Sequence, residues 1–279
     1  MHRVGSEEAT NWLREAVAES GHSGFTGFSV EGWDASTWIL NAMYEYVTPL
    51  PQLSADELLR QRIATGEIES LVINGVDLDE VATTTGAPLG RSHAPGPEWR
   101  RLRWSELADR TGAPLADSGT PPCFRWFSYS RWPTQIRPPA EGSLDRESFL
   151  RLAAILSNQP GSSRDMRVWC YYSPLATVEG PARGPVVIEG TLAELPDIYD
   201  WPEVCASPSN IWPDDRSWFI YSDWDLSGTR VSGTAKLIDA VVADLRLETI
   251  NYPKEHHRML PSRGEPARSF TTASCYRYM

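Results

Sequence analysis

The spacing of apolar residues predicts three helices in the first quarter of the chain. Apolar residues at positions 9, 12, 13, 16 and 17 share one face of a helix that starts at Ser6 and ends at Gly21. A second helix is expected to start at Asp34 or Ser36 and to continue through Tyr46. A capping box at residues 54–57 starts a third helix, which stops near residue 66.

Short strands and helices alternate along the rest of the chain. Asp145 is expected to cap a helix, and a second capping box at Thr191–Glu194 opens another. The further predicted helices cover residues 105–112, 145–156, 191–199 and 234–245, and the predicted strands cover residues 70–73, 99–104, 166–172, 186–189, 217–222, 229–232 and 247–251.

The predicted order, αββαββαβ, contains hairpins among the crossovers and indicates an α+β fold. We expect two packed α/β-type halves, of which the C-terminal half has a mixed, largely antiparallel sheet with helices on one face. Residues 1–115 form the N-terminal half, and the Pro- and Gly-rich residues 116–143 form a seam. Residues 144–279 form the C-terminal half, whose tail becomes irregular from about residue 253.

The charge balance narrows the range of partners. The net charge is −11, which repels phosphate backbones, so we expect no nucleic-acid partner. Such acidity favours either a cationic partner or simple solubility. No apolar run is long enough for a membrane span and no secretion signal is evident, so we expect a cytoplasmic protein. The four cysteines form no Cys-x-x-Cys pair; we expect reduced thiols and no structural zinc.

The densest cluster of polar and aromatic residues lies between positions 212 and 230. Twelve tryptophans are present in the chain, and this number favours the exposure of some on a binding surface. We predict an outward-facing docking surface made of Trp212, Asp214, Asp215, Arg216, Trp218, Asp223, Trp224, Asp225 and Arg230. In the competing interpretation, Asp223 and Asp225 cap a hairpin turn, while Asp215 and Arg216 form structural pairs.

A different hypothesis assigns chemistry to Asp223 and Asp225. Residues two apart on a strand share a face, so both carboxylates could hold Mg²⁺ or Mn²⁺ with a substrate diphosphate. This Asp-x-Asp arrangement resembles the metal site of some glycosyltransferases. Apart from this alternative, and a weaker one at residues 256–257, we expect no metal or cofactor and identify no catalytic residue. The spacing from Gly228 to Gly233 resembles a phosphate loop, but Lys236 comes too late for a Walker motif.

A single arginine cluster, Trp99-Arg-Arg-Leu-Arg-Trp104, lies on a predicted strand. Alternating arginines on a strand could bind a phosphate or a carboxylate. The favoured interpretation is a solvated strand edge that charges protect from strand addition.

The segments Ser207-Pro-Ser-Asn-Ile-Trp-Pro-Asp-Asp-Arg-Ser-Trp218 and Asp223-Trp-Asp-Leu-Ser-Gly-Thr-Arg-Val-Ser-Gly233 resemble a block shared by uncharacterised actinobacterial proteins. The resemblance covers roughly residues 205–250 and implies a common fold unit without a mechanism. Acidity, abundant tryptophan and the lack of a recognisable nucleophile favour a non-catalytic cytosolic binding protein, of the immunity or inhibitor type, that masks a basic protein partner. The alternative is a divalent-metal-dependent enzyme acting on a phosphorylated or nucleotide-sugar substrate.

Overall fold

The computed structural model describes most of the chain up to residue 251. The described residues are 1–20, 28–48, 60–61, 64–66, 72–73, 76–77, 92–112, 115, 121, 136–178, 184–223 and 226–251. Most of the predicted helix at residues 54–66 and most of the predicted seam lie outside these ranges, as does the tail from residue 252.

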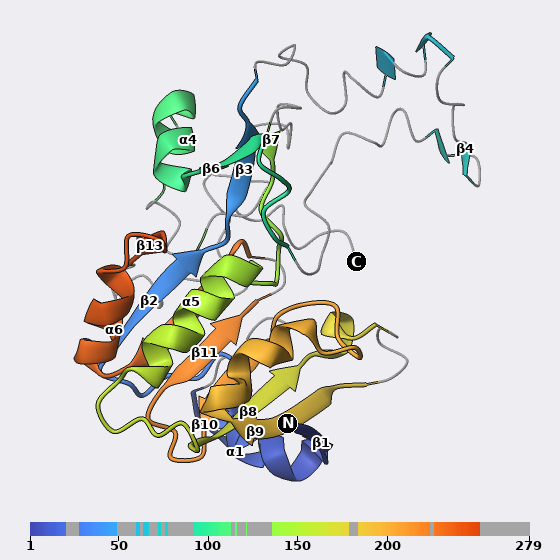
Figure 1. Cartoon of the computed structure of the whole chain (residues 1–279). Coiled ribbons are helices and arrows are strands. Elements are labelled where there is room, and N and C mark those ends of the chain that lie inside the picture. Colours follow the sequence, from blue (N-terminus) through green and yellow to red (C-terminus); the bar gives the residue numbers. More distant parts are fainter. Residues whose placement is uncertain are drawn as a thin grey trace, which may run out of the picture.

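Eight of the described strands form one antiparallel sheet (Figure 1). In spatial order they are β1 (His2–Val4), β9 (Val186–Thr191), β8 (Arg167–Tyr172), β10 (Asn210–Pro213), β11 (Phe219–Ser222), β12 (Gly228–Gly233), β2 (Ala35–Leu40) and β13 (Thr249–Ile250). All seven pairings between neighbouring strands are antiparallel. The prediction of an α+β fold is confirmed, and within the described residues the sheet is antiparallel rather than mixed.

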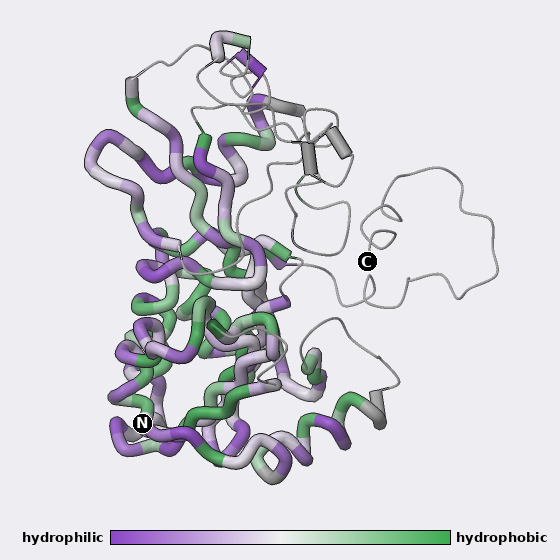
Figure 2. Tube along the Cα trace, turned by 90° about the vertical axis from the view of Figure 1, so that its right-hand side faces the viewer, coloured by the Kyte–Doolittle hydropathy of each residue, from purple (hydrophilic) through white to green (hydrophobic). Residues whose placement is uncertain are grey.

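Helices cover both faces of this sheet. On one face lie α5 (Arg146–Ser157), α6 (Ala235–Val242) and two 3-10 segments, η3 (Pro174–Ala176) and η5 (Leu192–Asp200). On the other face lies α1 (Ser6–Ser20), which matches the first predicted helix. The strands serve both cores because their side chains alternate between faces: along β8, Val168 and Cys170 pack under α5, while Tyr171 packs on the side of α1. In Figure 2, hydrophobic stretches run through the middle of the lower part of the molecule, and hydrophilic ones lie mainly around its outside.

A smaller sheet extends from the larger one. It contains β6 (Trp99–Leu102), β3 (Met43–Tyr46) and β7 (Ile136–Arg137), and α4 (Trp104–Thr111) packs against it (Figure 1). Only two residues separate β2 from β3, so the chain passes directly from one sheet to the other. The two remaining described strands, β4 (Val72–Ile73) and β5 (Val76–Asp77), are each two residues long and pair with each other in antiparallel orientation.

The predicted helix between Asp34 and Tyr46 is wrong, because this segment forms β2 and β3. Residues 37–45 are all buried, and β2 pairs with β12 on one side and β13 on the other. A strand buried on both faces loses the alternation that identifies strands in a sequence, so its apolar positions also fit a helical period. The strands β1 and β10 were not predicted from the sequence.

The sheet includes strands from both sides of the predicted seam. β1 and β2 belong to the predicted N-terminal half, yet β2 lies between β12 and β13, which belong to the C-terminal half. β1 likewise pairs with β9 at the other edge. The two sides of the seam therefore share one sheet and both of its cores.

Most of the helix starts and strands predicted after residue 98 are confirmed. Asp145 caps α5 by accepting a hydrogen bond from the amide of Ser148 at 3.0 Å, and Thr234 caps α6 in the same way through Leu237 at 3.3 Å. The capping box of Thr191 and Glu194 is present, but the segment that follows is a 3-10 helix. None of the described helices is long and apolar enough to cross a membrane.

Candidate functional site

The predicted docking cluster is divided between the two ends of β11. Asp214, Asp215 and Arg216 lie in the turn between β10 and β11, whereas Asp223 follows the last residue of β11. Six residues separate the two groups, and the four of them that form β11 alone correspond to roughly 13 Å of extended chain. The structure therefore does not bring the predicted residues together in one surface.

The prediction that Trp212 and Trp218 face outward is wrong. Their exposed fractions are 2% and 3%. Trp212 packs in the core beneath α1, and Trp218 packs in the core beneath α5 and α6, so the two indoles lie on opposite faces of the sheet. Both rings are large apolar surfaces on or beside central strands, where burial stabilises the fold more than exposure could contribute to binding.

Asp223 and Arg230 are buried as well, so they do not form an outward-facing surface. The carboxylate of Asp223 accepts a hydrogen bond of 2.6 Å from the hydroxyl of Tyr221. The Arg230 guanidinium donates to Glu31 Oε1 at 2.7 Å and to the Val30 carbonyl at 2.9 Å. These contacts hold both side chains in the fold, but they involve other partners than the competing interpretation named.

The alternative metal site stays a prediction, because Trp224 and Asp225 lie outside the described residues. In the described part of the chain, no three His, Cys, Asp or Glu side chains are grouped so that they could hold a metal ion. Residues 228–233 form the buried strand β12, not a phosphate-binding loop.

The arginine cluster of β6 is engaged by neighbouring groups. Arg100 forms ion pairs with Glu45 and Glu106, and Arg110 of α4 bonds to the same two carboxylates. Arg101 donates to the Arg246 carbonyl at 2.9 Å. β6 is the edge of the smaller sheet, as the favoured interpretation required, but its arginines stabilise the fold rather than simply facing solvent.

Two tryptophans outside the predicted cluster reach the surface beside the β10–β11 turn. Trp33 stacks on Phe219 with ring centroids 5.2 Å apart and an interplanar angle of 11°. Its Nε1 donates a hydrogen bond of 3.0 Å to the Arg216 carbonyl. The Arg216 guanidinium lies 4.5 Å from the ring centre of Trp12, on α1. Both indoles are half-buried, so each is held by packing while part of it stays accessible.

Exposed carboxylates lie close in sequence to Trp33 and to Arg216, the residue that contacts both indoles. Asp34 follows Trp33 in the chain, and Asp214 and Asp215 directly precede Arg216; all three aspartates are exposed. Glu31, whose side chain is 65% exposed, lies two residues before Trp33. We call the set consisting of Trp12, Glu31, Trp33, Asp34, Asp214 and Asp215 the acid–indole surface. The sequence analysis missed both indoles: it assigned Trp12 to the apolar stripe of the first helix, and it gave Trp33, which precedes the expected helix start at Asp34 or Ser36, no role.

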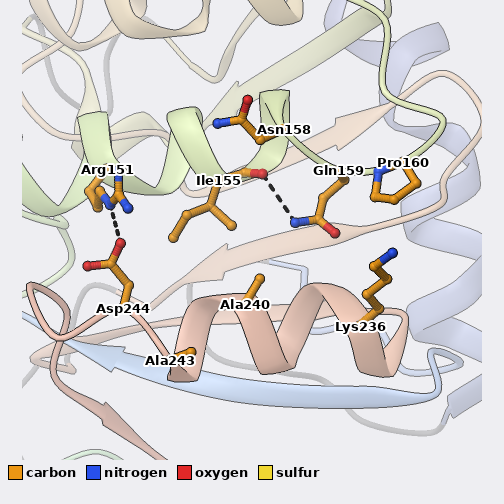
Figure 3. Close-up of a pocket in the computed structure, with 9 residues that line it drawn as sticks. All are labelled: Arg151, Ile155, Asn158, Gln159, Pro160, Lys236, Ala240, Ala243 and Asp244. Carbon is orange, nitrogen blue, oxygen red and sulfur yellow. Dashed lines mark hydrogen bonds and ion pairs between the residues drawn. The ribbon is translucent and has the colours of Figure 1, made fainter.

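A groove between α5 and α6 is the other notable concavity (Figure 3). It has a volume of about 520 Å³, and the Lys236 amine points into it from α6. Arg151 on α5 is paired with Asp244, and Gln159 donates to the Ile155 carbonyl at 3.2 Å. Arg151 and Gln159, which could contact a ligand, are thus already engaged with other groups of the protein. This groove carries a weaker argument for binding than the acid–indole surface.

No protein family, curated protein or solved structure matches the chain.

Proposed function

We propose that this protein is a non-catalytic cytosolic binding protein, of the immunity or inhibitor type, that masks a basic protein partner. We further propose that the partner docks on the acid–indole surface. The observation that supports this proposal is the presence of two half-buried, internally braced indoles next to four exposed carboxylates.

The contacts that hold the Trp33 ring in place favour a higher affinity for a partner. Its ring is stacked on Phe219 and its N–H is already bonded to Arg216, so little side-chain freedom remains to be lost on binding. Aromatic side chains that are fixed before binding are typical interface anchors. An arginine of the partner could stack on the accessible part of the indole.

The carboxylates of the acid–indole surface are the second feature that favours a basic partner. Asp34, Asp214 and Asp215 are positioned to pair with lysine or arginine side chains of a partner, and the net charge of −11 attracts a basic protein at long range. Because rim charges act mainly on the rate of association, complex formation should slow markedly with added salt.

The test uses a charge-matched pair of triple variants. The first, D34N/D214N/D215N, neutralises the acid–indole surface. The second, D109N/D197N/D239N, removes the same number of charges from exposed positions on α4, η5 and α6. Both variants and the wild type are used to capture partners from a native lysate. Each captured protein is then purified and its Kd for all three chains is measured.

The proposal expects a basic protein that forms a stoichiometric complex, with affinity at least tenfold weaker for the first variant and unchanged for the second. W33A should weaken the same complex, while W99A should not, since Trp99 is a half-buried indole of the smaller sheet. The proposal is wrong if the partner binds both triple variants equally, if no basic partner is recovered, or if the purified chain turns over a substrate.

A further inference from the structure

Half of the outer side of β2 has no described strand beside it. On its inner side, β2 pairs with β12 along all six residues from Ala35 to Leu40. On its outer side, β13 pairs only with Ile39 and Trp38. Among the described residues, no strand accompanies Ala35, Ser36 and Thr37 on that side. A strand edge with unpaired N–H and C=O groups is a template for another extended segment.

The chain leaves β13 in the direction of this open edge. Thr249 lies opposite Ile39 and Ile250 lies opposite Trp38, in antiparallel register. Because β13 is antiparallel to β2, it runs from the Ile39 position toward the Ala35 end of β2. β13 itself is therefore directed toward the end of β2 that adjoins Asp34 and Trp33 of the acid–indole surface.

The charge of this following segment is opposite to that of the surface. Residues 252–279, here called the basic tail, contain five basic residues and two acidic ones, Glu255 and Glu265, which gives a net charge of +3. The basic residues are Lys254, Arg258, Arg263, Arg268 and Arg277. Since the whole chain carries −11, residues 1–251 carry −14. The 28 residues of the tail could extend roughly 90 Å, so its reach does not limit contact with the surface.

We propose that the basic tail docks on the acid–indole surface of its own chain, starting as an extension of β13 along β2. The tail thereby competes with the basic partner for that surface, a consequence that rests on the proposed function. A partner must displace the tail, so the tail lowers the apparent affinity and favours partners that carry more positive charge.

Zero-length carbodiimide coupling of the full-length chain tests the contact, because Lys254 and Lys236 are the only lysines. The reagent joins an amine only to a carboxylate that it touches, and tandem mass spectrometry identifies the joined pair. We expect Lys254 to couple with Glu31, Asp34, Asp214 or Asp215. The yield should fall at least fivefold in 0.5 M NaCl, where charges are screened within a few ångströms. K254R should abolish the product, and coupling at Lys236, which lines a pocket with Asp215, serves as an internal control.

Hydrogen exchange of the full-length chain gives a second readout. The N–H groups of β2 alternate between its two sides, and because that of Leu40 donates to Glu248, that of Ser36 also faces the outer side. In K254E/R258E/R263E, the amide of Ser36 should exchange at least fivefold faster than in the wild type. R137E/R164E/K236E, which reverses three exposed cations elsewhere, should leave this amide unchanged. The proposal is overturned if Lys254 couples only with Glu248 or Glu255 while Lys236 reacts, or if exchange at Ser36 is the same in all three chains. Neither measurement requires the partner. The proposal of tail docking can therefore be contradicted without contradicting the proposed partner binding, and the reverse also holds.

Discussion

The indole Nε1 of Trp33 donates a hydrogen bond of 3.0 Å to the main-chain carbonyl of Arg216. The two residues are 183 positions apart, and the bond joins the segment before β2 to the turn between β10 and β11. It is the contact that places an accessible tryptophan beside Asp214 and Asp215. The first prediction concerns this contact.

Replacing Trp33 with Phe should retain the stack on Phe219 but remove the hydrogen bond, which lowers the free energy of unfolding by about 1 kcal/mol. Replacing it with Ala also removes the stack, at a further cost of about 1 kcal/mol. Urea denaturation of both variants at pH 7 measures the difference. Equal stability of the wild type and W33F would show that the hydrogen bond contributes nothing.

Arg216 has a φ of 54°, the only positive value among the described non-glycine residues. A side chain in this left-handed region costs about 1 kcal/mol relative to glycine. R216G and R216A both lose the contact with the ring of Trp12, so the backbone is what distinguishes them. We expect R216G to be about 1 kcal/mol more stable than R216A. Thermal and urea unfolding check this order, and the reverse order would contradict it.

The buried carboxylate of Asp145 joins α5 to the crossing between the two sheets. One oxygen accepts from the amide of Ser148 and the other from the amide of Ala42, each at 3.0 Å. D145A leaves both buried amides without a partner and should cost about 3 kcal/mol. T234A removes the single cap of α6 and should cost only about 1 kcal/mol. Chemical denaturation measures the free energy of unfolding of both variants. Equal losses in D145A and T234A would mean that the hydrogen bond from the Ala42 amide contributes little.

The stability of the smaller sheet should depend on pH. Hydrogen bonds from Arg100 lower the pKa of Glu106 to about 2, and hydrogen bonds from Arg110 lower the pKa of Glu45. In the unfolded chain these carboxyls titrate near 4.3, so the unfolded state binds protons first as the pH falls. Their contribution is therefore complete above about pH 5 and is lost as the pH falls toward 2.

The variant E106Q should flatten this dependence between pH 5 and pH 2, whereas E98Q, at an exposed position before β6, should leave it unchanged. The free energy of unfolding in urea, measured at pH 7, 4 and 2.5, provides the comparison. If the free energy of unfolding changed with pH in the same way for E106Q and the wild type, Glu106 would not be the source of the pH dependence.

Cys170 and Cys205 are free thiols in different environments. Cys170 is completely buried in β8, and burial raises the pKa of its thiol. Because only the thiolate reacts, N-ethylmaleimide at pH 8 should modify Cys170 at least tenfold more slowly than the half-buried Cys205. Peptide mass spectrometry at timed intervals gives both rates, and urea should make them equal. Comparable rates in the folded chain would be inconsistent with the burial of β8.

Local chemistry was sufficient to predict the elements with short-range signals. Asp145 was recognised as a cap because a cap depends on one side chain and an amide three residues away. The strands β8 and β11 were recognised from β-branched and aromatic runs bounded by turn residues.

Only the tertiary structure decided which side chains are accessible and which strands are neighbours. β2 was taken for a helix because its identity as a strand depends on β12 and β13, which lie almost 200 residues later in the chain. Trp212 and Trp218 are buried while Trp33 is half-exposed, although their local sequences are similarly polar. Accessibility is a property of the packed layers: alternation on a strand determines which face an indole occupies, and the helix covering that face determines whether water reaches it.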